Sequence, residues 1–318
     1  MMLLYAACIA GGFVLLSIGA DALIRGSVRL SLRSGISPLV IGLTVVAFGT
    51  STPELFVSLK ANLGGSGDIA VGNIVGSNIF NIAVILGLAA LIQPIRVQSQ
   101  LIRQDVPVMI AASLLFYVMV FDREVSRIEG IVLFTLLIGY IVLTIRQARQ
   151  GGEDELAEEI THHMPAATTR PIGDSAWIIG GILLLVGGSQ LLVQGAVGLA
   201  REAKVSEAII ALTIVAAGTG LPELATSIAA ALKKESDLAV GNVIGSNIFN
   251  LLCIGGFSAS IKPLRAPDIE AVDLSTMAVL AVLLLPVLRI GMRVGRIEGV
   301  LLLASYGAYL YYIWPVPH

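Results

Sequence analysis

Two glutamates stand alone in stretches that are otherwise apolar. Glu54 is the one ionisable side chain between positions 39 and 59, and Glu223 is the one between positions 208 and 232. Both stretches are long enough to cross a bilayer, so each carboxylate is expected near mid-depth. A carboxylate there is costly and by default functional. The chemistry open to it is the binding of a cation or of a proton.

A proline precedes each glutamate, at Pro53 and Pro222. Proline lacks a backbone N–H and its ring clashes with the carbonyl four residues back, which loosens the carbonyls of Gly49 and Gly218. Backbone that is not helical is tolerated at membrane depth only inside protein or beside a watery cavity. Because calcium prefers carbonyl, hydroxyl and carboxylate oxygens, each stretch is predicted to form half of a cation site.

The composition predicts a polytopic, all-α membrane protein. Of the 318 residues, 56% are hydrophobic and only 13% are charged, with a mean hydropathy of +0.90. A soluble domain has about a quarter of its residues charged. The net charge of −2 gives no indication of a nucleic-acid partner. Cys8 and Cys253 lie in apolar segments, so neither a disulfide framework nor a thiolate metal site is predicted.

Ten segments are long enough to span a membrane, at about 20 residues each. One long polar connection divides them into two halves of five, so we expect a first repeat at 1–149, a linker at 150–172 and a second repeat at 173–318. The expected spans are 3–31, 37–62, 69–92, 104–121, 127–149, 173–200, 206–232, 238–261, 269–288 and 296–315.

Basic residues at the ends of the spans predict the orientation. With the N-terminus outside, thirteen of the 20 Lys and Arg residues lie at cytoplasmic ends and seven at outer ends. Cytoplasmic loops of membrane proteins carry the excess of Lys and Arg. Both termini are therefore expected outside and the linker in the cytoplasm.

The two halves are copies of one another. A shift of 169 residues aligns Ile36–Asn81 with Val205–Asn250 without a gap, and 25 of the 46 positions are identical. The same shift aligns Arg127–Gly130 with Arg296–Gly299. Because five spans is an odd number, the second half must enter the membrane from the opposite side. Inverted repeats with helices interrupted at matching places, here the second and seventh, are typical of secondary transporters.

Each half also carries a second polar stretch, at 72–81 and at 241–250, and the two copies differ at only two of ten positions. A serine and an asparagine four residues apart share one face of a helix. The asparagines are predicted to line the site. The glycines fit either site lining or close helix packing. The residues concerned are Ser77, Asn81, Ser246 and Asn250, with glycines at 72, 76, 241 and 245.

The doubled pair of motifs resembles a known family. Gly-Thr-Ser-x-Pro-Glu, followed by Gly-Asn-x-x-Gly-Ser-Asn-Ile-Phe-Asn, resembles the two alpha repeats of the cation/calcium exchanger superfamily, and within it the prokaryotic sodium/calcium exchangers. The resemblance implies ten spans in an inner (plasma) membrane and sodium/calcium antiport by alternating access, with the first span of each half as the moving element. It implies no cofactor and no obligate protein partner, only calcium, sodium and lipid. It also implies Glu54 and Glu223 as central ligands, with Ala47, Thr50, Ser51, Ser77, Asn81, Ala216, Thr219, Ser246 and Asn250 supplying further oxygens.

Two positions depart from the family pattern. Gly220 stands where the motif usually has serine, so one hydroxyl expected in a sodium site is missing. Asn250 stands where potassium-dependent and some archaeal members have aspartate. The site therefore has two central carboxylates rather than three, which disfavours potassium dependence.

Competition for two carboxylates would couple the ions. Calcium neutralises both glutamates at once and several sodium ions can do the same, whereas two unneutralised carboxylates repel strongly at low dielectric. Only a loaded protein should then switch. Proton/calcium exchange is the alternative, because burial beside a second carboxylate favours protonation. The surrounding hydroxyls and amides, which a proton does not need, favour sodium.

Other function classes fit less well. An intramembrane hydrolase needs two carboxylates in unlike environments, and here they lie in near-identical repeats. A channel would need a ring of charges or a filter loop, which the sequence lacks. The pair His162-His163, in the acidic linker, is read as solvated rather than metal-binding. The protein is thus predicted to be a transporter and not an enzyme.

Overall fold

A computed structural model of the protein describes residues 1–151, 171–203 and 216–313. In these three ranges the secondary structure is helical apart from four strands of two residues each. Seven helices in the described ranges are long and apolar enough to cross a membrane, or eight when one bent pair is counted as a span. The expected seventh span, 206–232, and the linker, 150–172, lie partly outside the described residues. The expected tenth span, 296–315, corresponds to the helix Arg296–Ile313, which is not among the seven.

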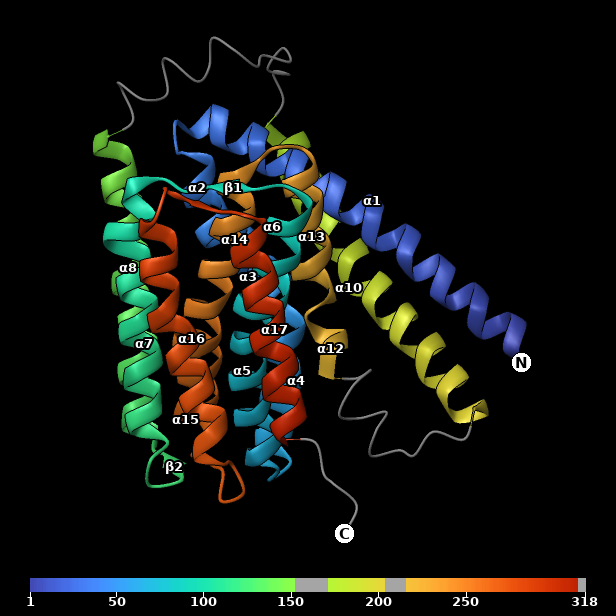
Figure 1. Ribbon diagram of the computed structural model, residues 1–318, viewed down its shortest axis with the longest axis vertical. Helices are drawn as coiled ribbons and strands as arrows, with labels where there is room; N and C mark the ends of the chain where they lie inside the picture. The colour runs from blue at the N-terminus through green and yellow to red at the C-terminus, as the bar shows by residue number, and fades with distance from the viewer. Residues whose placement is uncertain (152–170, 204–215, 314–318) are drawn as a thin grey trace.

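Most helices of the first half have a counterpart of the same type in the second half (Figure 1). The first half contains α1 (Met2–Ser34), α2 (Pro38–Ile41), η1 (Gly42–Val46), α3 (Ala47–Thr50), α4 (Thr52–Leu63), α5 (Gly67–Phe80), η2 (Asn81–Leu86), α6 (Gly87–Ile92), η3 (Leu101–Asp105), α7 (Val106–Met119) and α8 (Arg127–Gly151). The second contains α10 (Pro171–Glu202), α12 (Ala216–Thr219), α13 (Leu221–Leu232), α14 (Ser236–Phe249), η5 (Asn250–Gly255), α15 (Gly256–Ile261), α16 (Ala271–Arg289) and α17 (Arg296–Ile313).

The helix that carries Glu54 is broken beside its proline, as predicted. The segments Pro38–Thr50 and Thr52–Leu63 meet at an angle of 47°. Ser51, at the break, has φ −81° and ψ 6°, and Gly220 between α12 and α13 has nearly the same φ and ψ, −79° and 1°. In both copies the proline occupies the first turn of the second piece, where its missing N–H leaves no bond unmade.

A wider helical turn interrupts each of the two central spans. In Gly67–Ile92 the segment η2 begins at Asn81, and in Ser236–Ile261 the segment η5 begins at Asn250. Both segments have the i→i+5 bonding of a π-helix, which occurs mostly as single insertions and often at functional sites. The wide turn therefore begins, in each half, at the asparagine that the sequence assigns to the site.

The long helices α1 and α10 lie side by side and run away from the main bundle (Figure 1). Glycines bring them into backbone contact: a Cβ added at Gly19 would lie 2.8 Å from the Leu185 nitrogen, and one at Gly188 would lie 2.9 Å from the Leu16 nitrogen. Small residues at such positions allow helices to approach closely in lipid. The two helices thus contact each other more extensively than they contact the bundle.

Two short antiparallel ladders join the halves at opposite ends of the bundle (Figure 1). Strand β1 (Ile95–Arg96) pairs with β4 (Arg293–Val294), and β2 (Glu124–Val125) pairs with β3 (Leu264–Arg265). Each ladder combines one strand from each half. The all-α prediction therefore omitted these links, since two-residue strands carry no sequence period long enough to detect.

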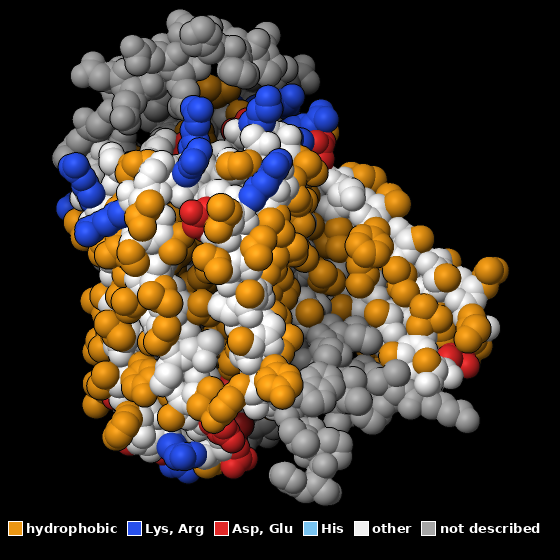
Figure 2. Space-filling model, in the orientation of Figure 1, with side chains coloured by type: hydrophobic (Ala, Val, Ile, Leu, Met, Phe, Trp, Pro, Cys, Tyr) orange, Lys and Arg blue, Asp and Glu red, His pale blue; other side chains and the backbone are white. Residues whose placement is uncertain are grey.

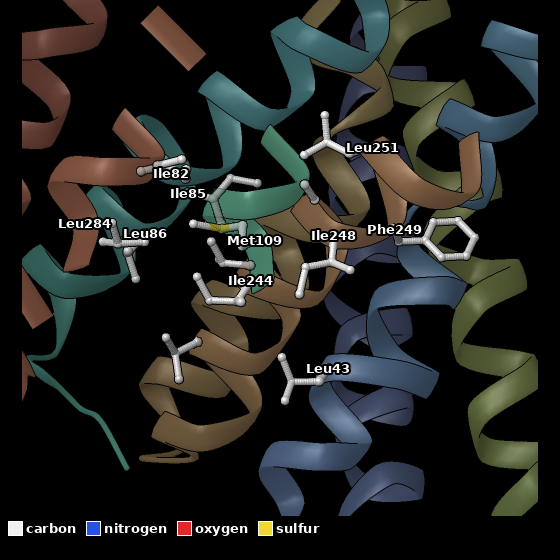
Figure 3. Close-up of a cluster of buried hydrophobic side chains, with 14 of the residues drawn as sticks. Leu43, Ile82, Ile85, Leu86, Met109, Ile244, Ile248, Phe249, Leu251 and Leu284 are labelled. Carbon is white, nitrogen blue, oxygen red and sulfur yellow. The ribbon is translucent and has the colours of Figure 1, made fainter. Parts of the chain in front are cut away.

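Apolar side chains fill the bundle and also cover its sides. Figure 3 shows a cluster around Met109, Ile244 and Ile85, each of which is 0% exposed. Its residues come from η1, η2, α7, α14, η5 and α16. Figure 2 shows hydrophobic side chains over the flanks, with Lys and Arg gathered at one end and charges of both signs at the other. Such a belt between polar ends suits a protein whose flanks lie in hydrocarbon.

Candidate ion-binding site

Glu54 and Glu223 come from different halves and lie together inside the bundle. Each stands in the first turn of the helix that follows a break, α4 or α13, and each is only 1% exposed. Their carboxylates are close enough to interact electrostatically. The free N–H groups of a helix start carry partial positive charge and stabilise an anion there. The two helix starts therefore lie where they can stabilise negative charge on the two carboxyl groups.

Side-chain hydroxyl groups of each half lie beside the glutamate of the other half. Ser51 Oγ donates to Glu223 Oε1 at 2.9 Å, and the Thr50 side chain also lies beside Glu223. In the opposite sense, Thr219 lies beside Glu54. Each break thus places hydroxyl-bearing side chains beside the carboxyl group of the other half.

Because Gly220 departs from the family motif, the two glutamates do not have the same hydroxyl groups beside them. Gly220 matches Ser51 in the repeat, so no hydroxyl faces Glu54 from that position. A Cβ added at Gly220 would lie 3.1 Å from the nearest carbon of the Phe80 ring, which is tighter than an ordinary carbon contact. The ring of Phe80 therefore packs where the missing side chain would begin.

Two asparagines that were not among the predicted site residues donate hydrogen bonds to the backbone carbonyls of the glutamates. Asn73 Nδ2 donates to Glu54 O at 3.3 Å and to Ser58 Oγ at 2.9 Å. Asn242 Nδ2 makes the same pair of bonds, to Glu223 O at 3.4 Å and Ser227 Oγ at 2.9 Å. Both asparagines belong to the doubled polar stretch, which was the signal available in the sequence.

Asn242 also joins the halves. Its Oδ1 accepts a hydrogen bond of 3.0 Å from Thr50 Oγ1. The same threonine hydroxyl lies 3.1 Å from Val46 O and 3.3 Å from Ala47 O. The hydrogen of the Thr50 hydroxyl is therefore donated to protein acceptors, while the lone pairs of its oxygen stay available to a cation.

The remaining predicted site residues lie on the two central spans. Asn81 and Asn250 are 2% and 0% exposed and begin the wide turns, and Ser246 is 0% exposed one helical turn before Asn250. Ser77 holds the matching place before Asn81 and is partly exposed. These positions agree with the shared face expected from the four-residue spacing.

Several of these buried atoms have no hydrogen-bond partner among the described residues. A buried polar atom without a partner is costly unless something satisfies it. A cation satisfies acceptor oxygens of carboxylate, hydroxyl and amide groups, which are the ligands of hard ions. The oxygens concerned are Glu54 Oε2, Glu223 Oε2, Thr219 Oγ1, Ser246 Oγ and Asn250 Oδ1.

The backbone carbonyls at the two breaks have different kinds of hydrogen-bond donor. Gly218 O, loosened by Pro222, accepts a hydrogen bond of 2.5 Å from Ser189 Oγ on α10. Ala47 O accepts from Ser51 N at 3.0 Å. Ala216 is the first residue of α12. A freed carbonyl in the second half is therefore satisfied by a helix of the α1–α10 pair.

The glycines of the second polar stretch serve close packing. A Cβ at Gly245 would lie 2.7 Å from the Leu43 Cα, and one at Gly241 would lie 2.9 Å from Leu39 O. The backbone of α14 thus lies directly against α2 and η1, which lead to the first break. For Gly72 and Gly76 the matching partner segment lies largely outside the described residues.

A protein-family model for sodium/calcium exchanger proteins matches residues 4–146 and 175–314. The chain belongs to the sodium/calcium exchanger family. Over 99% of both chains it is 38% identical to the inner membrane protein YrbG of Escherichia coli. It is 30% identical to the sodium/calcium exchanger MaX1 of Methanosarcina acetivorans, over 94% of this chain and 95% of that one.

Solved structures of an exchanger in this family have the same fold. The sodium-calcium exchanger NCX_Mj, soaked with zero Na⁺ and Ca²⁺, superposes with a TM-score of 0.85 at 32% identity, over 98% of this chain and 100% of that one. The family is one of membrane transporters that exchange cations for calcium. The protein is accordingly an integral membrane exchanger, and which ion drives calcium is taken up below.

Proposed function

We propose that the protein exchanges sodium for calcium by alternating access, with both ions bound between Glu54 and Glu223. The observation that carries the proposal is the pair of buried carboxylates from opposite halves, each with an oxygen that has no partner among the described residues. The neutral oxygens of Thr219, Ser246 and Asn250 lie on the adjoining elements. Together they form the mixed oxygen set that calcium and sodium prefer.

Charge balance supplies the coupling. Calcium brings two positive charges to two carboxylates, and sodium ions can replace it only when enough of them bind to offset the same charge. The unloaded pair would have to pass through low dielectric as two repelling anions. If three sodium ions exchange for one calcium ion, one net charge crosses per cycle, worth about 2.3 kcal/mol per 100 mV.

Proton/calcium exchange is the alternative, and the surroundings of the carboxylates favour sodium. A proton needs one carboxylate oxygen, whereas sodium needs several oxygens around it. The hydroxyl of Ser246 and the amide of Asn250, both 0% exposed, have no role in a purely protonic site. Neutral oxygen ligands buried beside a carboxylate therefore support a metal cation as the driving ion.

We also propose that the chain is an inverted repeat of ten spans, 1–149 and 173–318, joined by a cytoplasmic linker. The ladders support this, because a shift of 169 residues carries β1 onto β3 and β2 onto β4 while the ladders lie at opposite ends. The paired asparagine bonds support it too, since both members of each pair obey the same shift. The excess of basic residues at one end supports placing that end in the cytoplasm, with both termini outside.

The test is calcium-45 uptake into proteoliposomes with sodium, potassium or proton gradients imposed one at a time. We expect uptake with the sodium gradient alone, stimulated by a membrane potential of the favourable sign. We further expect Glu54→Gln and Glu223→Gln each to abolish it, because each removes half of the charge that balances calcium. The folded state should persist, since a neutral amide is less costly in lipid than an unpaired carboxylate.

The matched control is Asp105→Asn, which neutralises a carboxylate that is also 1% exposed but is the last residue of η3 and accepts a hydrogen bond from Tyr140. This variant should keep sodium-dependent uptake. Uptake driven by a proton gradient and indifferent to sodium would support the alternative. Near wild-type uptake by either glutamine variant would contradict the site.

A further inference from the structure

Two arginines face each other across the ladder β1–β4. Arg96 and Arg293 are partners in register, and their neighbours Ile95 and Val294, which are 1% and 0% exposed, form the other pair. Side chains alternate between the two faces of a strand, so both arginines project from the outer face. Both are exposed. Directly opposed residues of an antiparallel pair have Cβ atoms about 5 Å apart, and like charges there are destabilising.

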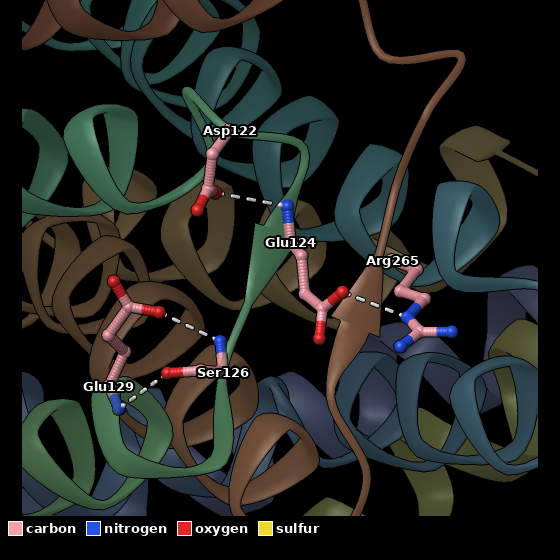
Figure 4. A network of polar contacts seen from close by, with 5 residues as sticks. All are labelled: Asp122, Glu124, Ser126, Glu129 and Arg265. Carbon is pink, nitrogen blue, oxygen red and sulfur yellow. Dashed lines mark hydrogen bonds and ion pairs between the residues drawn. The ribbon is translucent and has the colours of Figure 1, made fainter.

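The matching ladder at the other end has residues of opposite charge at the same two positions. In β2–β3 the register pairs Glu124 with Arg265, and Arg265 Nε lies 2.9 Å from Glu124 Oε2 (Figure 4). The inner pair, Val125 and Leu264, is buried just as Ile95 and Val294 are. The fold therefore accommodates an ion pair at this position without any change of backbone.

The internal repeat shows which residue makes the difference. A shift of 169 residues carries Arg96 onto Arg265, so one arginine is common to both ladders. The same shift carries Glu124 onto Arg293. The ladder β2–β3 thus has a carboxylate at the position where β1–β4 has a guanidinium. Of these two ladders, only β1–β4 has two positive charges in register.

The surroundings of Arg96 and Arg293 do not neutralise them. Within the described ranges neither side chain has a hydrogen bond or ion pair. The nearest carboxylate along the chain, Glu298, accepts a hydrogen bond of 3.0 Å from Gly295 N. Arg296 adds a further positive charge, although its Nε donates to Leu91 O at 3.2 Å. No residue in the described part of the chain offsets this repulsion, and an anion from outside the chain can do so.

We infer that Arg96 and Arg293 form a binding site for the phosphate of an anionic phospholipid. Guanidinium groups bind phosphate oxygens in a bidentate manner, and two opposed guanidiniums can hold one phosphate between them. The ladder β1–β4 lies at the upper end of the bundle in Figure 1, and Figure 2, in the same orientation, shows Lys and Arg gathered at that end beyond the apolar flanks. Lipid phosphates occupy that level of a membrane. With the orientation given under Proposed function, that level is the inner leaflet. Lipid binding itself does not rest on that orientation.

The test is native mass spectrometry of the purified full chain in detergent with added phosphatidylglycerol or phosphatidylcholine. We expect one phosphatidylglycerol to be retained by the wild type in preference to phosphatidylcholine. Arg293→Glu, which copies Glu124 and allows a pair with Arg96, should weaken that retention. Each basic residue near anionic lipid contributes about fivefold to binding, so reversing one charge should lower retention by more than fivefold.

A gain-of-function variant is the matched control. Glu124→Arg gives the β2–β3 ladder two arginines in register, and it should retain a second phosphatidylglycerol. Both variants should keep sodium-dependent calcium uptake in vesicles, since neither residue contacts the ion site. Unchanged retention by Arg293→Glu would overturn the inference. Displacement of the lipid by millimolar inorganic phosphate would also overturn it, because free phosphate rather than lipid would then be the ligand.

Discussion

At the scale of single residues, the two central glutamates have unequal surroundings despite their common origin. Glu223 accepts a hydrogen bond from Ser51, whereas the matching position beside Glu54 is Gly220 with the Phe80 ring against it. Glu54 therefore lacks the serine donor that Glu223 has, and under the proposed function it depends more on an incoming cation. The missing hydroxyl removes one oxygen from one side of the site only, and this makes the two halves of the site chemically distinct.

Asn250→Asp tests whether this position faces the ions. The amide is 0% exposed and both its polar atoms lack a partner within the described residues. A third carboxylate beside two others must take up a proton or an additional cation. We expect exchange to gain a pH dependence between about pH 5 and 8 or a dependence on potassium. Sodium/calcium exchange in vesicles, with Asn247→Asp as the control, measures it; curves that superimpose on the wild type would exclude Asn250 from the site.

Residue types and spacing in the sequence predicted the site residues, but not their partners. Isolated carboxylates beside prolines predict an ion site because burial of charge has few other uses in lipid. That Ser51 serves the glutamate of the other half, and that Asn73 and Asn242 support the carbonyls of the two glutamates, depends on how the breaks cross in space. A sequence period describes one helix and carries no information about the helix opposite.

At the scale of elements, the α1–α10 pair is attached to the bundle by few polar links. Asp21 on α1 pairs with Lys233 at the end of α13 and with Arg25 at 2.6 Å. In the repeat the same two positions are Gln190 and Gly64, so the matching residues cannot form an ion pair. If α1 and α10 shift during transport, this link stabilises the conformation described here over its mirror state.

Removal of the Asp21–Lys233 pair should shift that balance. The two side chains are 36% and 35% exposed, and such ion pairs are worth at most about 1 kcal/mol, which corresponds to a factor of about five in populations. We expect Asp21→Asn and Lys233→Gln each to change the half-saturating calcium concentration on one membrane face by up to this factor. The charge-reversed double variant, Asp21→Lys with Lys233→Asp, should restore it. Identical values in all four proteins would contradict a role for the link.

Breaks in helices were easier to predict than links between them. Proline and glycine have fixed backbone consequences, so the interruptions next to Glu54 and Glu223 follow from the local sequence. The wide turns at Asn81 and Asn250 do not, because a π-turn differs from an α-turn by a single residue in its hydrogen bonding. The ladders depend on two residues per strand, and only the register of distant segments decides them.

At the scale of the whole molecule, the ends of the bundle identify the relation between the halves. The loop between α4 and α5 lies beside β3, since a Cβ at Gly67 would meet the Arg265 backbone. The equivalent loop between α13 and α14 lies beside β1, where Gln98 Nε2 donates to Asp237 Oδ2 at 2.7 Å. Equivalent loops thus lie at opposite ends, which a duplication with an odd number of spans requires.

Cysteine labelling of these two equivalent loops tests the inverted topology in a membrane. Ser66 and Lys234 are both exposed and lie in the loops that follow α4 and α13. In a background with Cys8→Ser and Cys253→Ser, we expect Ser66→Cys to react with a membrane-impermeant maleimide on intact cells, because the basic residues favour that end as the outer one. Lys234→Cys should react only after the cells are permeabilised. Both positions face water and both loops are equally short, so a difference in reactivity reports sidedness rather than burial. Labelling of both from the same side would mean that the halves are parallel, and the charge balance argued for the ion site would lose its two-fold arrangement.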